Sequence, residues 1–473
     1  MQRPRAGRAA MRSAVRAAQT AGVILLAIVV LAAGVWTFYN VKWNRRLAGE
    51  IENWKAIGLP LQVSEAIPPP AGRAENAAPL YLQVFGINLE AASPAAPADG
   101  IVLSGVSVAD RETLISYLEA TDRAPLAPAV ADLLRRPEVR ATLDVLRKAS
   151  VLPRASFPVN WELGFAAPMP HLGKLREAAR LVTCTALLTA EEGDIAGGLE
   201  WCATGVRMAQ HVTQEPTLVA QLSGMAMQAM AMDATADITS AVAVPAEISK
   251  PLREALAELD ILGDYGQAMR LEVALGRATF EQLREHPEQL QSALAGDSDG
   301  ERLVSGIYST WLWNPVYAYD MATYMRLSAT QYEACRLPWR QGRQTLEKTD
   351  KEVAGLTYAR LTRVLAPASE RVLQRRDTSL ARSQLCRVAL ELKAYKARNG
   401  HYPDTPAELQ QHLAWDIPED VFSGESLIYR LSGEGFVLYS TGPDAIDNGG
   451  VAGDDGGGGA NSQGTDLTWE AVN

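Results

Sequence analysis

The sequence has little of what catalysis and metal binding usually require. Its 473 residues include only five histidines and four cysteines, and neither type shows metal-ligand spacing such as His-Glu-x-x-His or Cys-x-x-Cys. It also lacks a nucleophile elbow of the Gly-x-Ser-x-Gly type, a Walker-type phosphate loop and a dinucleotide-binding Gly-x-Gly-x-x-Gly after a strand. We therefore predict no catalytic residue and no organic cofactor.

Basic charge is scarce relative to acidic charge, and it is unevenly placed. The formal net charge is -10, which argues against nucleic acid as a partner because a phosphate-binding surface needs a basic excess. The first segment is nevertheless basic and has no acid; it holds Arg3, Arg5, Arg8, Arg12 and Arg16. The charge pattern predicts a start that faces a membrane and an acidic end that faces cations.

An uninterrupted apolar run follows the basic segment. Residues 20–39 carry no charge, and a helix of about 20 residues spans a bilayer core. A cleaved signal peptide is the alternative, but its apolar run would be shorter and would end in small residues rather than in Trp36, Phe38 and Tyr39. The positive-inside rule then places residues 1–19 in the cytoplasm and the body in the periplasm of a bacterium, anchored in the inner membrane.

The sequence after the apolar run predicts a mainly α-helical fold. Residues 40–107 should form a helix that continues from the anchor and then, after Pro68–Pro70, an extended linker that docks through Leu80, Tyr81 and Phe85. Apolar residues at spacings of three and four predict antiparallel helices over residues 108–370. The aromatic stretch at 307–325 is typical of a core, with a groove or a membrane surface as alternatives.

The clearest unit within these helices is a hairpin at residues 171–235. Gly193 and Asp194 should form its turn. The small residues that line both helices are similar to those of a tetratricopeptide-type hairpin, although one irregular hairpin in a bundle is the alternative. Cys184 and Cys202 fall on opposite helices, so they form either a disulfide or two small buried side chains.

The last part, residues 375–473, has a different pattern and predicts a small α+β module. An amphipathic helix is expected over 380–399, ended by Asn399 and Gly400, and a short helix should begin at the capping residue Thr405. Two strands, 427–431 and 436–440, should pair as a β-hairpin across a tight loop. A Gly- and Asp-rich loop follows, and then Leu467 and Trp469.

This module resembles the globular end of the major pseudopilin of type II secretion systems. The matching pieces are ALELKAYKARNGHYP, FSGESLIYR, GFVLYSTGPD and a closing Asp-x-x-Trp, within a resemblance that covers the last part of the chain, about a fifth of its length. In that family the acidic loop binds calcium, so the resemblance implies calcium ligands among five acids: Asp444, Asp447, Asp454, Asp455 and Asp466. The anchor lies far upstream and no pseudopilin processing site is present, so the module is expected at the end of a different protein.

The sequence thus leads to three hypotheses about function. The first is a non-catalytic envelope scaffold that spans the bilayer once and binds calcium or a protein partner, linked to a secretion or pilus-like assembly. The second is an envelope hydrolase whose site is built from scattered polar residues. The third is a purely structural anchor with a disordered terminal loop. A deep pocket with clustered acids would favour the hydrolase, and an ordered terminal loop around a cation would favour the scaffold.

Overall fold

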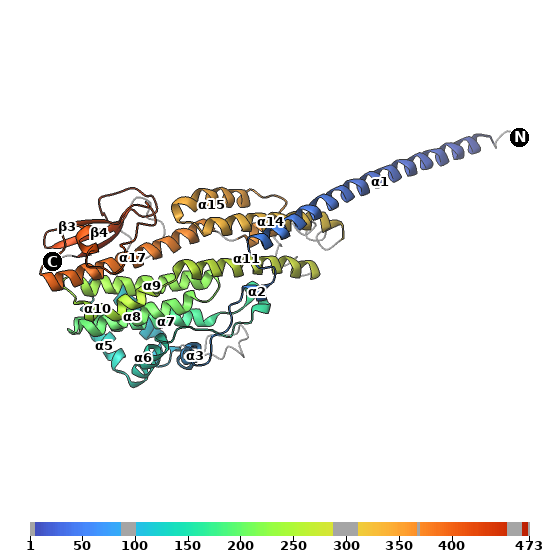
Figure 1. Ribbon diagram of the computed structural model, residues 1–473. Helices are drawn as coiled ribbons and strands as arrows, with labels where there is room; N and C mark the ends of the chain where they lie inside the picture. Colours follow the sequence, from blue (N-terminus) through green and yellow to red (C-terminus); the bar gives the residue numbers. More distant parts are fainter. Residues whose placement is uncertain (1–4, 87–100, 287–310, 367–368, 452–465, 472–473) are drawn as a thin grey trace. The chain divides into compact units, whose positions relative to one another are not determined.

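A computed structural model describes residues 5–86, 101–286, 311–366, 369–451 and 466–471. The chain is mainly helical, with one small three-stranded sheet near its C-terminus (Figure 1). It divides into two compact units. The first comprises residues 1–61, 276–329 and 352–366, and the second comprises residues 62–275, 330–351 and 367–473.

The described helices and strands follow in this order. The helices in the first part of the chain are α1 (Arg5–Ala56), α2 (Val63–Ala66), α3 (Ala78–Phe85), α4 (Val108–Glu119), α5 (Ala127–Arg135), α6 (Pro137–Ser150), α7 (Pro170–Glu191), α8 (Ile195–Thr213), α9 (Leu218–Thr239), α10 (Ala246–Ala257) and α11 (Ile261–Glu285). After them come the 3-10 turn η3 (Trp311–Trp313), α14 (Asn314–Cys335), α15 (Trp339–Ala354), α16 (Arg360–Leu365), α17 (Ser369–Asn399) and α18 (Pro406–Gln410). The strands are β1 (Ile101–Leu103), β2 (Val106–Ser107), β3 (Ile428–Ser432), β4 (Gly435–Ser440) and β5 (Leu467–Ala471).

The helix α1 is long and apolar enough to cross a membrane. None of the residues in its most apolar stretch is buried. Large side chains are exposed all round the helix, among them Leu25 at 63% and Leu31 at 71%. A helix that is apolar on every face has no polar side to turn toward water. The expected continuation beyond the apolar run is confirmed, because α1 extends without interruption to Ala56.

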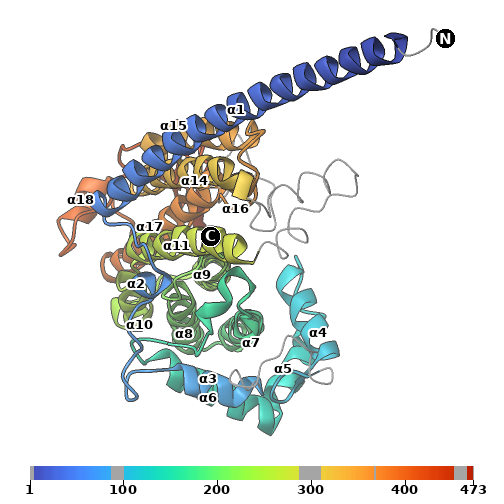
Figure 2. The same ribbon diagram turned by 90° about the vertical axis from the view of Figure 1, so that its right-hand side faces the viewer.

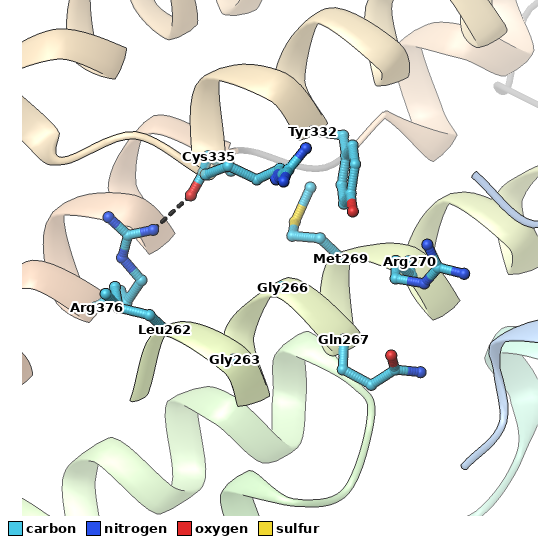
Figure 3. Close-up of a pocket in the computed structure, with 10 residues that line it drawn as sticks. Leu262, Gly263, Gly266, Gln267, Met269, Arg270, Tyr332, Cys335 and Arg376 are labelled. Carbon is cyan, nitrogen blue, oxygen red and sulfur yellow. Dashed lines mark hydrogen bonds between the residues drawn. The ribbon is translucent and has the colours of Figure 1, made fainter. Parts of the chain in front are cut away.

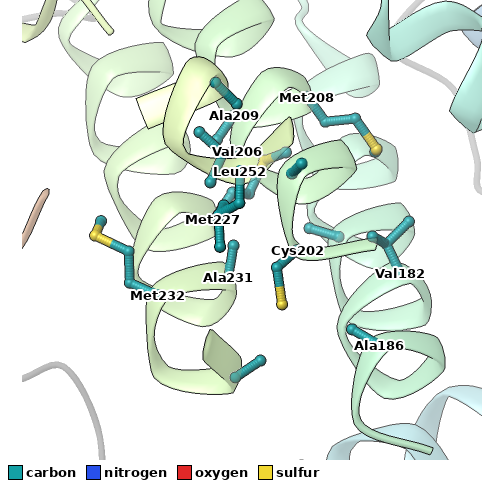
Figure 4. Close-up of a cluster of buried hydrophobic side chains, with 14 of the residues drawn as sticks. Val182, Ala186, Cys202, Val206, Met208, Ala209, Met227, Ala231, Met232 and Leu252 are labelled. Carbon is teal, nitrogen blue, oxygen red and sulfur yellow. The ribbon is translucent and has the colours of Figure 1, made fainter. Parts of the chain in front are cut away.

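The core of the second unit is built on the predicted hairpin. The helices α7 and α8 flank Gly193, whose φ of 99° suits glycine, and the Asp194 side chain caps α8 by accepting a hydrogen bond from the Gly197 amide at 2.8 Å. The predicted hairpin turn is therefore confirmed. The helices α9 and α10 complete this layer (Figure 1), and small and apolar side chains fill the space between the helices (Figure 4).

The structure decides between a disulfide and two buried thiols for Cys184 and Cys202. Both Cys184 and Cys202 are buried and free, and the Cys184 thiol lies 3.7 Å from the Leu114 carbonyl oxygen. Burial raises the pKa of Cys202 to about 12. The two residues are small buried side chains rather than the halves of a disulfide.

Shorter helices pack around α7 and α8 (Figure 2). One of them corrects the sequence analysis, because residues 78–85 form the helix α3 and not an extended linker. Pro79 stands in its first turn, where proline is tolerated, and Gly86 ends it with a φ of 61°. The docking contacts were predicted correctly: Tyr81 and Phe85 are buried.

In the first unit, α1 packs along α14. The Trp54 indole donates a hydrogen bond of 2.7 Å to the Met325 carbonyl oxygen, and the Trp54 side chain is fully buried. Tyr317 and Tyr324 are buried against Phe280, which confirms the core interpretation for that part of the aromatic stretch. The start of the stretch, residues 307–310, lies outside the described residues.

The C-terminal module is an antiparallel sheet covered by α17. The expected hairpin is confirmed as β3 and β4, which are joined through Gly433 and Glu434 in a turn with a Gly433 φ of 60°. A third strand, β5, pairs with β4 and was not predicted. The helix α17 also begins 11 residues before the predicted 380, at Ser369, and its sheet-side face packs on β4 and β5.

A glycine at the contact between α8 and α9 gives a stability prediction. A Cβ atom at Gly224 of α9 would lie 2.4 Å from the Thr213 methyl carbon and 3.0 Å from the Ala209 carbonyl oxygen, both on α8. Gly224→Ala should therefore destabilise the chain by about 1–3 kcal/mol through overpacking. Gly173→Ala is the matched control, since its Cβ meets nothing within 4 Å and alanine favours a helix by up to about 1 kcal/mol. Urea denaturation measures both; equal effects of the two variants would contradict the close packing.

Candidate functional site

Three of the five predicted calcium ligands are described, and two of them meet on one turn. The Asp466 side chain, only 3% exposed, accepts hydrogen bonds from the Gly450 amide at 2.7 Å and the Asn448 amide at 3.1 Å. Asp447 accepts from the Gly449 amide at 2.8 Å. The structure thus brings Asp447 and Asp466 onto the turn at residues 448–450.

The other predicted ligands are placed differently. Asp444 sits in its own local turn, where it accepts a hydrogen bond of 3.0 Å from the Ile446 amide. Asp454 and Asp455 lie outside the described residues. Within the described part of the chain, no three His, Cys, Asp or Glu side chains converge as a metal-binding group.

The turn between Asp447 and Asp466 is fixed against the sheet. The Tyr439 hydroxyl of β4 donates to Asp447 at 2.9 Å, and this bond, after that from the Gly449 amide, lowers the pKa of Asp447. Gly450 lies over the Tyr439 ring, where a Cβ atom would approach ring carbons to 3.1 Å, and its φ of 77° also requires glycine. The acidic turn is therefore a built part of the module, with hard carboxylate oxygens of the kind that calcium prefers.

Asp420, a carboxylate that the sequence did not single out, holds the end of β4. Asp420 is 1% exposed and accepts hydrogen bonds from the Phe422 amide, from the Ser440 hydroxyl at 2.6 Å and from both the amide and hydroxyl of Thr441. Ser423 also donates to it. Because its oxygens are so fully used, we assign Asp420 to holding the end of β4 rather than to binding a ligand.

A cavity of about 390 Å³ lies in the second unit, between α11 and the ends of α14 and α17 (Figure 3). Its lining is rich in guanidinium groups and contains neither a carboxylate nor an imidazole; it consists of Leu262, Gly263, Gly266, Gln267, Met269, Arg270, Tyr332, Cys335, Arg336 and Arg376. Such a lining can hold a polar or anionic group. It does not supply the acid and base pair that hydrolysis requires.

The most buried arginine of this cavity is already engaged. Arg376 is 1% exposed, pairs with Asp377 at 2.6 Å and donates to the carbonyl oxygens of Cys335 and Leu337. It therefore joins the end of α14 to α17. Burial raises the pKa of the Cys335 thiol to about 11, so this group is protonated at neutral pH and is not a ready nucleophile.

Two histidines are buried among α3, α7 and α8. His171 is fully buried, stacks on Phe157 and pairs with Glu215 at 2.7 Å. His211 Nε2 lies 2.7 Å from the Leu152 carbonyl oxygen, so it must donate, and Nδ1 then accepts from the Tyr81 hydroxyl at 2.8 Å. Both imidazoles are closed off from solvent and connect elements of the core.

The protonation of His211 gives a pH prediction. Burial lowers the pKa of His211 to about 4, against about 6.5 in an unfolded chain. Between these values the unfolded state binds a proton that the folded state does not. The contribution of His211 to stability is therefore complete above pH 6.5 and is lost at roughly 1.4 kcal/mol per pH unit as the pH falls toward 4.

The variant His211→Gln isolates this effect. At pH 7.5 it should be less stable by about 1–3 kcal/mol, because the Tyr81 hydroxyl and the Leu152 carbonyl lose their partner. The gap in stability between wild type and variant should shrink as the pH falls from 6.5, while titrating groups common to both chains cancel. Urea denaturation across this range measures it, with the exposed His412→Gln as control. A constant gap from pH 7.5 to 4.5 would show that His211 does not titrate as its burial requires.

Comparison with known proteins adds no family to these findings. The pseudopilin and tetratricopeptide resemblances therefore rest on the residues of this chain alone and stay predictions. No protein-family model, no curated protein and no solved structure matches the chain significantly.

Proposed function

We propose that this chain is a single-pass membrane protein of a bacterial envelope that serves as a scaffold, with a terminal module that binds calcium and docks a protein partner. The observation that carries the proposal is the exposed apolar surface of α1, where residues such as Ile24, Val30 and Phe38 are 55–62% exposed. Moving each such side chain out of water is favourable by a free energy of about 1.5–3 kcal/mol.

The charges that flank the apolar run support an exported body. Five arginines precede it. On the other side are Lys42, Arg45 and Arg46, and Arg46 pairs with Glu50 at 2.7 Å, which offsets part of the basic charge there. The excess of positive charge on the N-terminal side favours a cytoplasmic N-terminus and a periplasmic body in the inner membrane.

The scaffold role is supported by how the terminal module is joined to the rest of the second unit. The helix α17 packs on α9 and α10 with one part and on the sheet with another, within one continuous apolar core. Lys393 donates to the Ser240 carbonyl oxygen at 2.9 Å, and Glu391 pairs with Arg253 at 2.6 Å. The module would therefore present its acidic turn on a firmly held base, as a docking element linked to a secretion or pilus-like assembly requires.

The topology can be tested with reporter fusions. A reporter that is active only outside the cytoplasm should be active when it is fused after residue 60 or at Asn473, because the Arg-rich start retains the N-terminus inside. The matched control is the same reporter fused before residue 1, which should be inactive. The reverse pattern would overturn both the orientation and the periplasmic assignment.

Calcium binding can be tested on the full chain in detergent. Calcium at about 100 times its dissociation constant should stabilise the folded state by roughly 2.7 kcal/mol. The double variant Asp444→Asn, Asp447→Asn should lose this gain, because calcium needs about six to eight oxygen ligands and charged oxygens bind it best. The matched control is Asp404→Asn, Asp416→Asn, which removes two exposed acids of the same module.

Thermal unfolding with calcium, with magnesium and with a chelator gives the readout. The proposal predicts a calcium-specific rise in the melting temperature for wild type and for the control variant. Identical melting of the wild type in calcium and in chelator would remove calcium from the proposal and leave the acidic turn as a self-contained structural feature.

A further inference from the structure

The short turn η3 lies beside the end of the apolar run of α1. The Trp36 indole nitrogen donates a hydrogen bond of 3.1 Å to the Leu312 carbonyl oxygen. Trp36 precedes Tyr39, the last residue of the apolar run, by three residues, which is about 4.5 Å along a helix axis. Leu312 is therefore held at the level where the apolar run ends.

Both segments change from apolar to polar at the same level. In α1 the change comes between Tyr39 and Asn40. In the segment formed by η3 and α14 it comes between Trp313 and Asn314. The two asparagines meet, with the Asn314 side-chain Nδ2 donating to the Asn40 side-chain oxygen at 2.7 Å. Further along, Trp43 and Tyr319 pack edge to face with ring centroids 4.6 Å apart. The register between the segments is thus fixed by contacts on the polar side of the change.

The apolar side of η3 is only partly covered by the residues that the structure describes. The Leu312 side chain is 50% exposed, in a Trp-Leu-Trp sequence that no acid interrupts. Tryptophan prefers the layer between hydrocarbon and water, where its ring is buried and its N–H stays hydrogen-bonded. In water an exposed leucine beside the apolar run would gain nothing, whereas in that layer it would leave water together with α1.

From these contacts we infer that the turn η3, through Leu312, forms a second membrane contact, inserted in the interfacial layer of the leaflet from which α1 emerges. The occupant of this surface is the phospholipid bilayer itself. The inference rests on the proposed membrane anchor, and it adds that the chain is attached at two neighbouring points. With α1 as its one attachment, the first unit could turn about the axis of that helix. A second insertion fixes which side of α14 faces the lipid.

The depth of single labelled positions tests this inference. The full chain is placed in vesicles of phosphatidylcholine and phosphatidylglycerol with an environment-sensitive fluorophore on Leu312→Cys. The four native cysteines are buried, and a labelled wild-type chain gives the background. Lipids that carry a nitroxide near the headgroup or deep in the acyl chain then report the depth of the label.

Labels at two control positions distinguish a failure of this inference from a failure of the proposed membrane anchor. Val30→Cys lies in the apolar run and is 62% exposed, and Val151→Cys lies in the second unit and is 64% exposed. The Leu312 label should lose most of its emission to the shallow nitroxide and less to the deep one. The Val30 label should be quenched by the deep nitroxide, and the Val151 label by neither.

Each outcome decides one point. If the Leu312 label behaves like the Val151 label while the Val30 label is quenched, the second membrane contact is wrong and the anchor stands. If the Val30 label is not quenched, the anchor itself is wrong, and the inference falls with it.

Discussion

The structure depends on one constraint, the need of a long apolar helix for a surface other than water. The side chains along the apolar window of α1 are covered by no other part of the described chain. Removing them from water is worth more than any single contact in the folded body, since each large side chain contributes about 1.5–3 kcal/mol. A bilayer satisfies this need, and the contacts of α1 with α14 begin just where the apolar run ends.

The second organising element is α17. It carries apolar side chains that belong to the same core as α9 and as the sheet, so the terminal module and the helices fold as parts of one unit. Some of its polar contacts are buried: Arg376 donates to the Cys335 carbonyl oxygen at the end of α14, and Ser379 donates to Gln228 of α9 at 2.7 Å. Burial of Lys393 in this region lowers its pKa to about 8. Buried polar links of this kind are costly unless paired, and they fix the register between elements.

The sequence alone was enough for features whose signal is local. The apolar run of α1, the Gly193 turn and the β3–β4 turn each depend on a few adjacent residues, and all three are where they were expected. The start of α17 was missed because Arg376 and Asp377 read as solvated charges, although both are buried. The strand β5 was missed because its alternation is short and follows a Gly-rich loop.

The polar contacts of the core could not be predicted, because their partners lie far apart in the sequence. His211 meets Tyr81 across 130 positions of sequence, and Asp420 meets Ser440 across 20, so neither pairing leaves a pattern in a local window. For the acidic loop, the sequence singled out Asp447 and Asp466 but could not show that their oxygens accept amide hydrogen bonds on a common turn. Residue type is visible in a sequence, whereas the partner of each polar group is not.

The central claim is that α1 holds the chain in a lipid bilayer. Extraction of bacterial membranes with alkaline carbonate tests it directly, because this treatment strips proteins that are bound only at the surface and leaves those that span the bilayer. The full chain should stay in the membrane pellet, and a chain that lacks residues 1–39 should appear in the supernatant. Release of the full chain into the supernatant would contradict the account.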